Sequence, residues 1–395
     1  MKGAERAEAA GIPPFDASRL DRLMEEAELD VVLVTSKHSI QYLLGGYRYF
    51  FYSYMDAHGL SRYLPIFIYV RGRPDLAAYV ASPMEVHERE LKKFWVAEFM
   101  ADNMTSTQYA ASAVRYLGRI GRTKGRIGVE VGFLPVDAHS ILQQGLPQAS
   151  IVDATFTLEL LRAIKSPAEL KIVKDASEKV IDSILAVFSA HEPGSTKNEL
   201  VDALRREEQA RGLNFEYCLT NIGTDFNRAP SDQVWRLGEV LALDSGGNYL
   251  GYIGDLCRMA YSGEPDSELI DLLAEVEEIQ QAARKPIRAG ARGAEIYAGP
   301  DALLARSSNR NELSFVAHGM GIVSHEAPWL TDKCSVPYLA YHADRPLEAG
   351  MVLSIETTLL HPRRGFIKLE DTLAVTDDGY EAYGDHGRGW NPTRA

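Results

Sequence analysis

Two aspartates within an apolar stretch are the first residues of this sequence that could perform chemistry. Asp244 and Asp255 lie among apolar residues in the segment 240–259. The segment predicts two antiparallel strands around a turn at the Gly-Gly-Asn run 246–248, which would bring the carboxylates side by side. A buried carboxylate is costly without a partner. Taken alone, the segment favours a turn-capping aspartate or an ion pair with Arg258 over a metal ligand.

Two histidines follow in a glycine-containing segment. His318 precedes Gly319 and Gly321, which allow the backbone to approach a ligand closely, and His325 comes seven residues after His318. A lone histidine here would more often be structural, but the second one indicates a polar pocket. The spacing matches neither a nucleotide-binding glycine loop nor a zinc helix with two histidines four residues apart.

A second pair of carboxylates repeats the theme of the first. Glu356 and Glu370 lie in two apolar runs on either side of a turn at 362–365. The pattern predicts another hairpin, with one carboxylate on each strand aimed at a shared centre.

These residues together form a set of four carboxylates and one imidazole. Four clustered negative charges repel strongly, whereas two divalent cations would neutralise them and hold a hydroxide between ions about 3.5 Å apart. Oxygen-rich ligation with one nitrogen suits manganese first, with iron, cobalt or zinc as alternatives. The predicted metal ligands are Asp244, Asp255, His318, Glu356 and Glu370.

The elements that must position these residues fall into two parts of the chain. Residues 1–157 alternate predicted strands and helices, typical of an α/β domain, and contain an aromatic run at 47–54. That run favours core packing and a pocket-lining loop equally. Ser166, Pro167 and Glu169 then form a strong helix start. We therefore expect an α/β (α+β) chain with domains at 1–157 and 158–395.

Composition excludes several function classes. A formal net charge of −13 argues against a nucleic-acid surface. No apolar run approaches the roughly 18 residues of a membrane span, and the first residues lack the apolar core of a secretory signal. Three dispersed cysteines predict neither disulfides nor a zinc ribbon. We expect a cytoplasmic protein that binds neither membranes nor nucleic acids.

The chain resembles the creatinase/aminopeptidase P/prolidase family of metalloenzymes over essentially its whole length. The resemblance implies a creatinase-type N-terminal domain, a C-terminal pita-bread domain and a homodimer, with every metal-ligand position filled by the expected residue type. The matching residues are Leu161-Arg-Ala-Ile-Lys-Ser-Pro167, Asp244 with Asp255, His318-Gly-Met-Gly, His325-Glu-Ala-Pro328, and Glu356 with Glu370-Asp371.

The same resemblance implies roles for the surrounding residues. Glu356 would act as general base, and His325 would steady the substrate or the transition state. The partner's N-terminal domain often borders the active site in this family, which makes the aromatic run 47–54 a candidate contact. The expected substrate contacts are His325, Asn227, Trp329 and Tyr49.

The sequence departs from the family pattern at several helper positions. Asn227 stands where peptidases carry a further histidine, and an amide cannot shuttle a proton. Trp329 stands where archaeal-type prolidases place an arginine, so a substrate carboxylate would need another clamp, from Arg258, Arg228 or a partner residue. His342 and His361 are candidates to replace the absent histidine. Thr357 replaces the usual proline after Glu356, and an insert spans 331–346.

Three functions are compatible with this pattern. The first is a dinuclear hydrolase that cleaves an Xaa-Pro-like peptide or a small amide. The second is a lyase or another catabolic enzyme on the same scaffold, similar to dimethylsulfoniopropionate lyases or creatinase. The insert and Asn227 favour the lyase, whereas His325 and Gly246 stand where those lyases carry aspartates. The third is a non-catalytic binding module, which the complete ligand set argues against.

Overall fold

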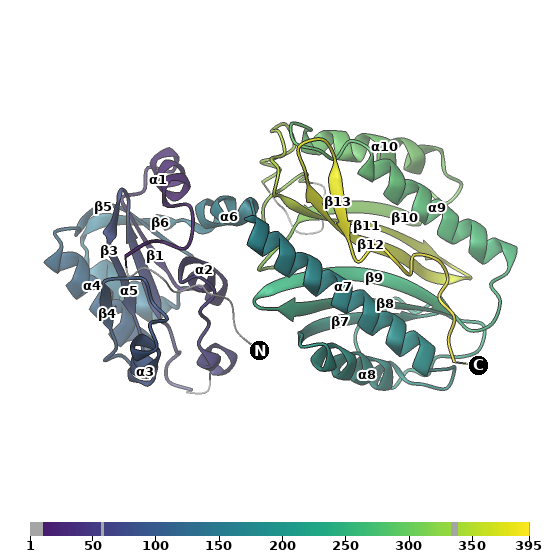
Figure 1. The fold of residues 1–395 in the computed structure, drawn as a ribbon, viewed down its shortest axis with the longest axis horizontal. Helices are drawn as coiled ribbons and strands as arrows, with labels where there is room; N and C mark the ends of the chain where they lie inside the picture. The colour runs from purple at the N-terminus through teal and green to yellow at the C-terminus, as the bar shows by residue number, and fades with distance from the viewer. Residues whose placement is uncertain (1–10, 57–58, 333–338, 395) are drawn as a thin grey trace. The chain divides into compact units, whose positions relative to one another are not determined.

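The computed structural model describes residues 11–56, 59–332 and 339–394, so that 333–338 of the expected insert lie outside it (Figure 1). The chain divides into two compact units, residues 1–162 and 163–395. The expected junction at 157/158 and this division both lie within helix α6 (Thr155–Ala163).

The N-terminal unit is built on a mixed six-stranded sheet. Its strand order is β4-β3-β2-β1-β5-β6, in which the central strand β1 pairs antiparallel with β2 and parallel with β5. The central strands β1 and β2 are buried on both faces, as their unbroken apolar sequences predict. The strands are β1 (Val31–Val34), β2 (Ile66–Val70), β3 (Arg73–Val80), β4 (Glu98–Met100), β5 (Lys124–Val129) and β6 (Gln148–Asp153), and the helices besides α6 are α1 (Ala17–Glu26), α2 (Lys37–Leu43), α3 (Val86–Glu90), α4 (Ser106–Arg119) and α5 (Val136–Gly145).

The C-terminal unit is built on a seven-stranded sheet with the order β10-β11-β12-β9-β8-β7 and β13 paired to β12. Every strand pair in this sheet is antiparallel. The strands are β7 (Asn214–Ile222), β8 (Val240–Tyr249), β9 (Tyr252–Tyr261), β10 (Leu313–Gly319), β11 (Val352–His361), β12 (Gly365–Val375) and β13 (Tyr380–Tyr383).

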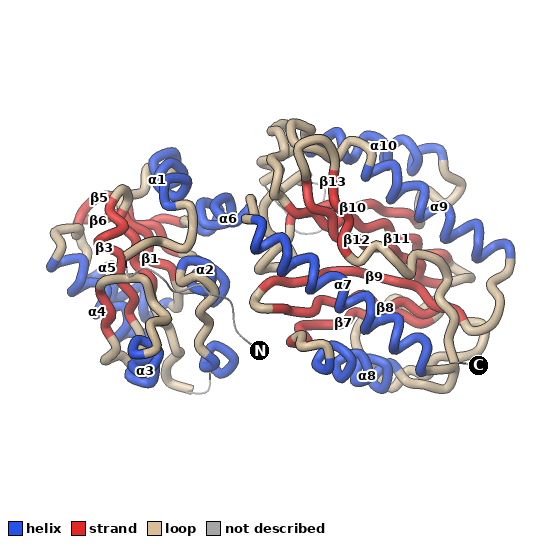
Figure 2. Tube along the Cα trace, viewed as in Figure 1, coloured by secondary structure: helices blue, strands red, loops and turns tan. Residues whose placement is uncertain are grey.

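Two long helices pack on this sheet, one on each hairpin. Helix α7 (Pro167–Ala190) packs on β8 and β9, and α9 (Ser267–Arg284) packs on β11 and β12 (Figure 2). The Ser166 side chain caps α7 together with Glu169, as the sequence predicts. Helices α8 (Lys197–Ala210) and α10 (Gly293–Arg306) pack beside α7 and α9 respectively. Each half of the unit is therefore a helix pair on a hairpin.

The helices of the described residues contain no segment long and apolar enough to cross a membrane.

Candidate metal centre

The five predicted ligands lie on five strands of the C-terminal sheet. Asp244 is on β8, Asp255 on β9, His318 on β10, Glu356 on β11 and Glu370 on β12. Glu356 lies directly opposite Glu370, and His318 lies opposite Ser354, two residues before Glu356. Glu370 in turn pairs with Cys257, two residues after Asp255. Since side chains alternate along a strand, this register puts all five on one face of the sheet.

The residues adjacent to the ligands face the helices on the other side of the sheet. A Cβ on Gly254 would lie 2.7 Å from the backbone nitrogen of Ser177 in α7, so the backbones are in close contact there. The ligands therefore point away from the helices. Further contacts of this kind are Ser245 Oγ to Glu208 Oε1 of α8 at 2.8 Å, and Thr357 Oγ1 to Gln280 Oε1 and Gln280 Nε2 to Asp371 Oδ2 of α9 at 2.9 and 2.7 Å.

The first hairpin differs from the prediction in the position of its turn. The turn is formed by Leu250 and Gly251, which both have positive φ angles of 51° and 96°. Asn248 Oδ1 accepts a hydrogen bond from Gly251 N at 2.9 Å and so holds the turn. The run 246–248 lies inside β8 instead. Glycine is needed at 246 because a Cβ there would come within 2.3 Å of the Tyr217 ring. The expected turn at 246–248 was wrong, and Asp255 pairs with Gly246, diagonal to Asp244.

Three of the predicted ligands are close enough to share one cation. Ligand atoms of Asp255, His318 and Glu370 lie within 4.8 Å of one another, and all three residues are buried. His318 Nδ1 lies 3.1 Å from the Gly319 carbonyl oxygen, an arrangement in which Nδ1 donates its proton. Nε2 then carries a lone pair and has no hydrogen-bond partner among the described residues. It lies 3.8 Å from Glu356 Oε1 and 3.9 Å from Glu370 Oε1, as a metal-binding imidazole should.

A lysine that the sequence reasoning missed lies among the carboxylates. Lys368 Nζ lies 2.6 Å from Asp244 Oδ2, 2.5 Å from Glu356 Oε2 and 2.7 Å from Glu370 Oε2. The Arg228 guanidinium also pairs with Asp244 Oδ2. Lys368 could have been found from its place two residues before Glu370, on the same face of an otherwise apolar strand.

These charges shift the pKa values of the carboxylates. Burial and the negative charge of Asp244 raise the pKa of Asp255 to about 8. Burial and Asp255 raise the pKa of Glu370 well above its usual value. Burial acts to raise the pKa of Glu356, but the Lys368 ammonium together with His318 and His325 lowers it to about 2. Lys368 contacts Glu370 but not Asp255, and a cation beside Asp255 would stabilise its ionised form.

Tyr217 on β7 is a second residue of the centre without a sequence signal. Its hydroxyl donates a hydrogen bond to Asp255, which opposes the rise in the pKa of that carboxyl. The absence of a side chain at Gly246 makes room for its ring. Only the pairing of β7 with β8, which opposes Tyr217 to Gly246, brings it there.

The predicted helper residues are spread over several environments. His325 stacks on His318 with ring centroids 3.8 Å apart and an angle of 13° between the planes. Burial, together with the adjacent His318, lowers the pKa of His325 to about 4. Asn227 is exposed, and its Oδ1 accepts a hydrogen bond from Ala229 N at 3.1 Å. Trp329 is buried, and its backbone nitrogen donates to His342 Nδ1 at 3.0 Å.

One expectation about helpers does not agree with the structure, and another stays a prediction for a residue that lies in a core. Arg258 is fully buried and binds backbone carbonyl oxygens and Asp371, so it is no clamp for a substrate carboxylate. Tyr49 is buried in the core of the N-terminal unit, and its hydroxyl donates to the Met84 carbonyl at 3.2 Å. The exposed aromatics of the run 47–54 are Phe50 and Tyr54.

The histidines proposed as substitutes also have structural roles. His342 Nδ1 accepts the Trp329 amide, and His361 Nδ1 accepts the Arg364 amide at 3.0 Å in the turn between β11 and β12.

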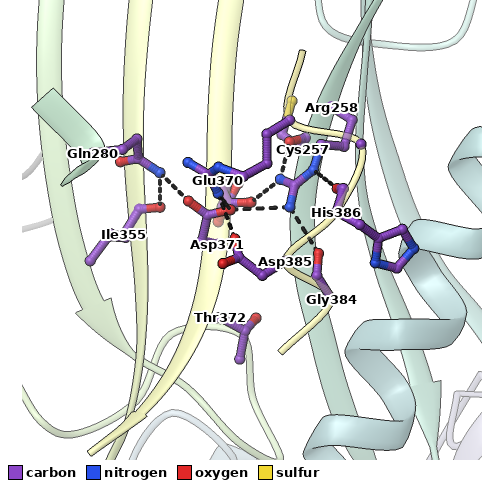
Figure 3. A network of polar contacts seen from close by, with 12 residues as sticks. Cys257, Arg258, Gln280, Ile355, Glu370, Asp371, Thr372, Gly384, Asp385 and His386 are labelled. Atoms are coloured by element: carbon purple, nitrogen blue, oxygen red, sulfur yellow. Dashed lines mark hydrogen bonds and ion pairs between the residues drawn. The ribbon is translucent and has the colours of Figure 1, made fainter. Parts of the chain in front are cut away.

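A network behind the centre fixes the backbone of β12 (Figure 3). Arg258 Nη1 donates to the carbonyl oxygen of Glu370 at 2.8 Å, and its Nη2 lies 3.1 Å from Asp371 Oδ1. Arg284 and Arg388 also contact the Asp371 carboxylate, at 3.0 and 2.5 Å. Burial alone would raise the pKa of Asp371, but these three guanidinium groups lower it below its usual value. These contacts hold the segment of β12 that carries Glu370.

The chain is similar in sequence and in fold to known peptidases. A model described as metallopeptidase family M24 matches residues 168–377, and one for the creatinase/prolidase N-terminal domain matches 17–164. The uncharacterized peptidase YqhT of Bacillus subtilis is 24% identical over 91% of this chain and 95% of its own length. The probable dipeptidase PepE of Mycobacterium bovis is 28% identical over 57% of this chain and 60% of its own. The structure of the Xaa-Pro dipeptidase from Bacillus anthracis superposes with a TM-score of 0.79 at 21% identity, covering 95% and 98% of the two chains.

Proposed function

Because the chain belongs to metallopeptidase family M24, with a creatinase-type N-terminal domain and a pita-bread domain, we propose that it is a metal-dependent hydrolase of short peptides or small amides. The bond would be the C–N bond of an Xaa-Pro-like peptide or a related amide. The observation that carries the proposal is the buried Nε2 of His318, which faces the carboxylates of Glu356 and Glu370 without a hydrogen-bond partner among the described residues.

The residues fit a divalent cation held by Asp255, His318, Glu356 and Glu370. Such an ion, when bound, polarises a carbonyl group and lowers the pKa of water. Glu356, whose Oε1 faces the same position as His318 Nε2, would accept a proton from the attacking water. His325, stacked on His318, is positioned to steady the oxygen of the scissile carbonyl.

Several finer predictions from the sequence stay predictions. They are manganese as the physiological ion, the homodimer and the cytoplasmic location. The same holds for substrate contacts by Asn227, Trp329 and Tyr49. A second metal ion with Asp244 as its ligand is also a prediction, and the Lys368 ammonium beside Asp244 argues against it.

The experiment that tests the proposal is hydrolysis of a panel of Xaa-Pro dipeptides before and after metal removal. We expect stripping with a chelator to abolish cleavage and added Mn²⁺ to restore it. Asp255→Ala and Glu370→Ala should reduce kcat/KM by at least about 100-fold without recovery in Mn²⁺. Lys171→Ala, which removes an exposed ion pair with Asp175, is the control and should retain activity. Full turnover after exhaustive stripping would contradict metal dependence.

Asn227 favours a lyase as the second candidate, since no proton-transferring group stands at this position. Product analysis separates the two reactions, because hydrolysis in ¹⁸O-water places ¹⁸O in the carboxylate product and elimination does not. A metal-dependent product without ¹⁸O, containing a new carbon–carbon double bond, would establish the lyase.

A further inference from the structure

Lys368 lies where a second cation of the centre would lie. An ammonium group has three N–H donors, and each finds a carboxylate oxygen within 2.7 Å, on Asp244, Glu356 and Glu370. These are three of the four carboxylates predicted to share two metal ions. The ammonium is thus fully coordinated by the oxygen atoms that a second ion would need.

The lysine is fixed in this position by the strand that carries it. Lys368 is 2% exposed and lies in the middle of β12, where its backbone pairs with Thr358. Its backbone nitrogen also contacts Met259 Sδ at 3.3 Å. A charged side chain this deep in an antiparallel sheet requires permanent partners, which the three carboxylates supply.

The oxygen atoms of the two glutamates divide between two positions. The Oε2 atoms of Glu356 and Glu370 contact Lys368, whereas their Oε1 atoms face His318 Nε2 at 3.8 and 3.9 Å. Glu370 Oε1 also accepts a hydrogen bond from Ser354 Oγ at 2.8 Å, which orients this carboxylate. One position is thus filled by the ammonium, and the other is lined by imidazole and carboxylate donors.

The net charge of the centre also favours one ammonium group and one metal ion. Lys368 and Arg228 together offset two of the four carboxylates, and both contact Asp244 Oδ2. One divalent cation would neutralise the remaining two negative charges. A second divalent cation beside Lys368 would leave an excess of positive charge at short range.

We infer that the Lys368 ammonium takes the place of one of the two metal ions, so that the centre binds a single divalent cation through Asp255, His318, Glu356 and Glu370. This inference rests on the proposed metal-dependent function and specifies its metal requirement. In such a centre Asp244 is a partner of Lys368 and Arg228 and does not ligate the ion. Lys368 is a positioning residue that orients Glu356 and Glu370.

Metal counting on the full-length chain tests the inference. Metal-free protein is equilibrated with Mn²⁺, and bound manganese is measured by dialysis with elemental analysis and by isothermal titration. We expect one Mn²⁺ per chain in the wild type, with the electron paramagnetic resonance signal of an isolated ion. Two Mn²⁺ per chain, or the signal of a spin-coupled pair, would overturn the inference and leave the metal-dependent function standing. No bound Mn²⁺ would overturn both.

The number of bound Mn²⁺ ions in three variants tests the role of Lys368. Lys368→Ala frees the oxygen atoms of the second position, so we expect two Mn²⁺ per chain, whereas Lys171→Ala should remain at one. A count of one in folded Lys368→Ala would contradict the idea that the ammonium stands in for an ion. Asp244→Asn gives an answer that does not depend on folding of the lysine variant. It should still bind one Mn²⁺, and loss of that ion would show that Asp244 is a ligand after all.

Discussion

At the residue scale, the centre depends on which nitrogen of His318 carries its proton. The Gly319 carbonyl receives the Nδ1 proton, so Nε2 is left as a donor atom facing Glu356 and Glu370. The environment of each carboxylate is equally specific, because Lys368 contacts Glu356, Glu370 and Asp244 but not Asp255. Three of the four carboxylates are therefore ion-paired with Lys368, and Asp255 is not.

Glu208, behind the centre, provides a prediction about pH. It is fully buried, and this burial raises its pKa to about 7. The folded protein therefore retains a proton that the unfolded chain releases near the ordinary value of 4.5. Stability conferred by that proton is complete below about pH 4.5 and is lost as pH rises to about 7, a change on the order of 3 kcal/mol.

Glu208→Gln should remove this loss, because the amide does not titrate. Urea denaturation at pH 5 and pH 7.5 measures the free energy of unfolding of both proteins. The variant should be more stable than the wild type only at the higher pH. An equal effect at both values would mean that Glu208 does not titrate in this range.

At the element scale, antiparallel pairing assembles the centre from strands that are far apart in sequence. The apolar runs and the turn at 362–365 were sufficient to predict that Glu356 and Glu370 would lie together, and their direct pairing confirms this. The first turn was misplaced because two successive glycines have two interpretations. Glycines at 246 and 247 can form a turn, or they can leave room for side chains of neighbouring elements. Gly246 makes room for Tyr217, and Gly247 approaches Val180 and Leu213, residues whose positions no local pattern determines.

Long-range packing also limits what could be predicted for the helper residues. Tyr49 belongs to an aromatic run in which buried and exposed rings alternate irregularly, and the sequence alone does not show which ring is buried. Arg258 follows Cys257 on β9 and faces the C-terminal residues 384–386, a contact separated by more than a hundred residues. Such partners become visible only when the sheet is assembled.

The contact between β9 and α7 leads to a prediction about stability. A Cβ at Gly254 would lie 2.7 Å from the Ser177 backbone nitrogen, so strand and helix would have to separate. Gly254→Ala should therefore destabilise the C-terminal unit by roughly 1–3 kcal/mol or more, as overpacking does. Chemical denaturation measures the change.

Gly118→Ala is the matched control, since a Cβ there meets nothing within 4 Å and the residue lies in α4. It should be neutral or stabilising by up to about 1 kcal/mol. Equal effects of the two substitutions would contradict the close contact between strand and helix.

At the scale of the whole molecule, the chain is two units with separate hydrophobic cores. All predicted metal ligands belong to the second unit, whose sheet and helices hold them. A bound ion should therefore stabilise the second unit directly.

Calorimetry of metal-free protein with and without Mn²⁺ checks this expectation. At a concentration of about 100 times Kd, the ion should stabilise the folded unit by about 2.7 kcal/mol and raise its Tm by several degrees. His318→Ala should lose this shift. A shift of the same size in His318→Ala would place the stabilising ion elsewhere.

The most direct test of the metal centre is a crystal structure of the Mn²⁺-loaded protein with anomalous diffraction data. We predict an anomalous peak at bonding distance, about 2.0–2.3 Å, from His318 Nε2 and from carboxylate oxygens of Asp255 and Glu370. A protein saturated with Mn²⁺ whose anomalous peaks all lie away from His318 would contradict the account.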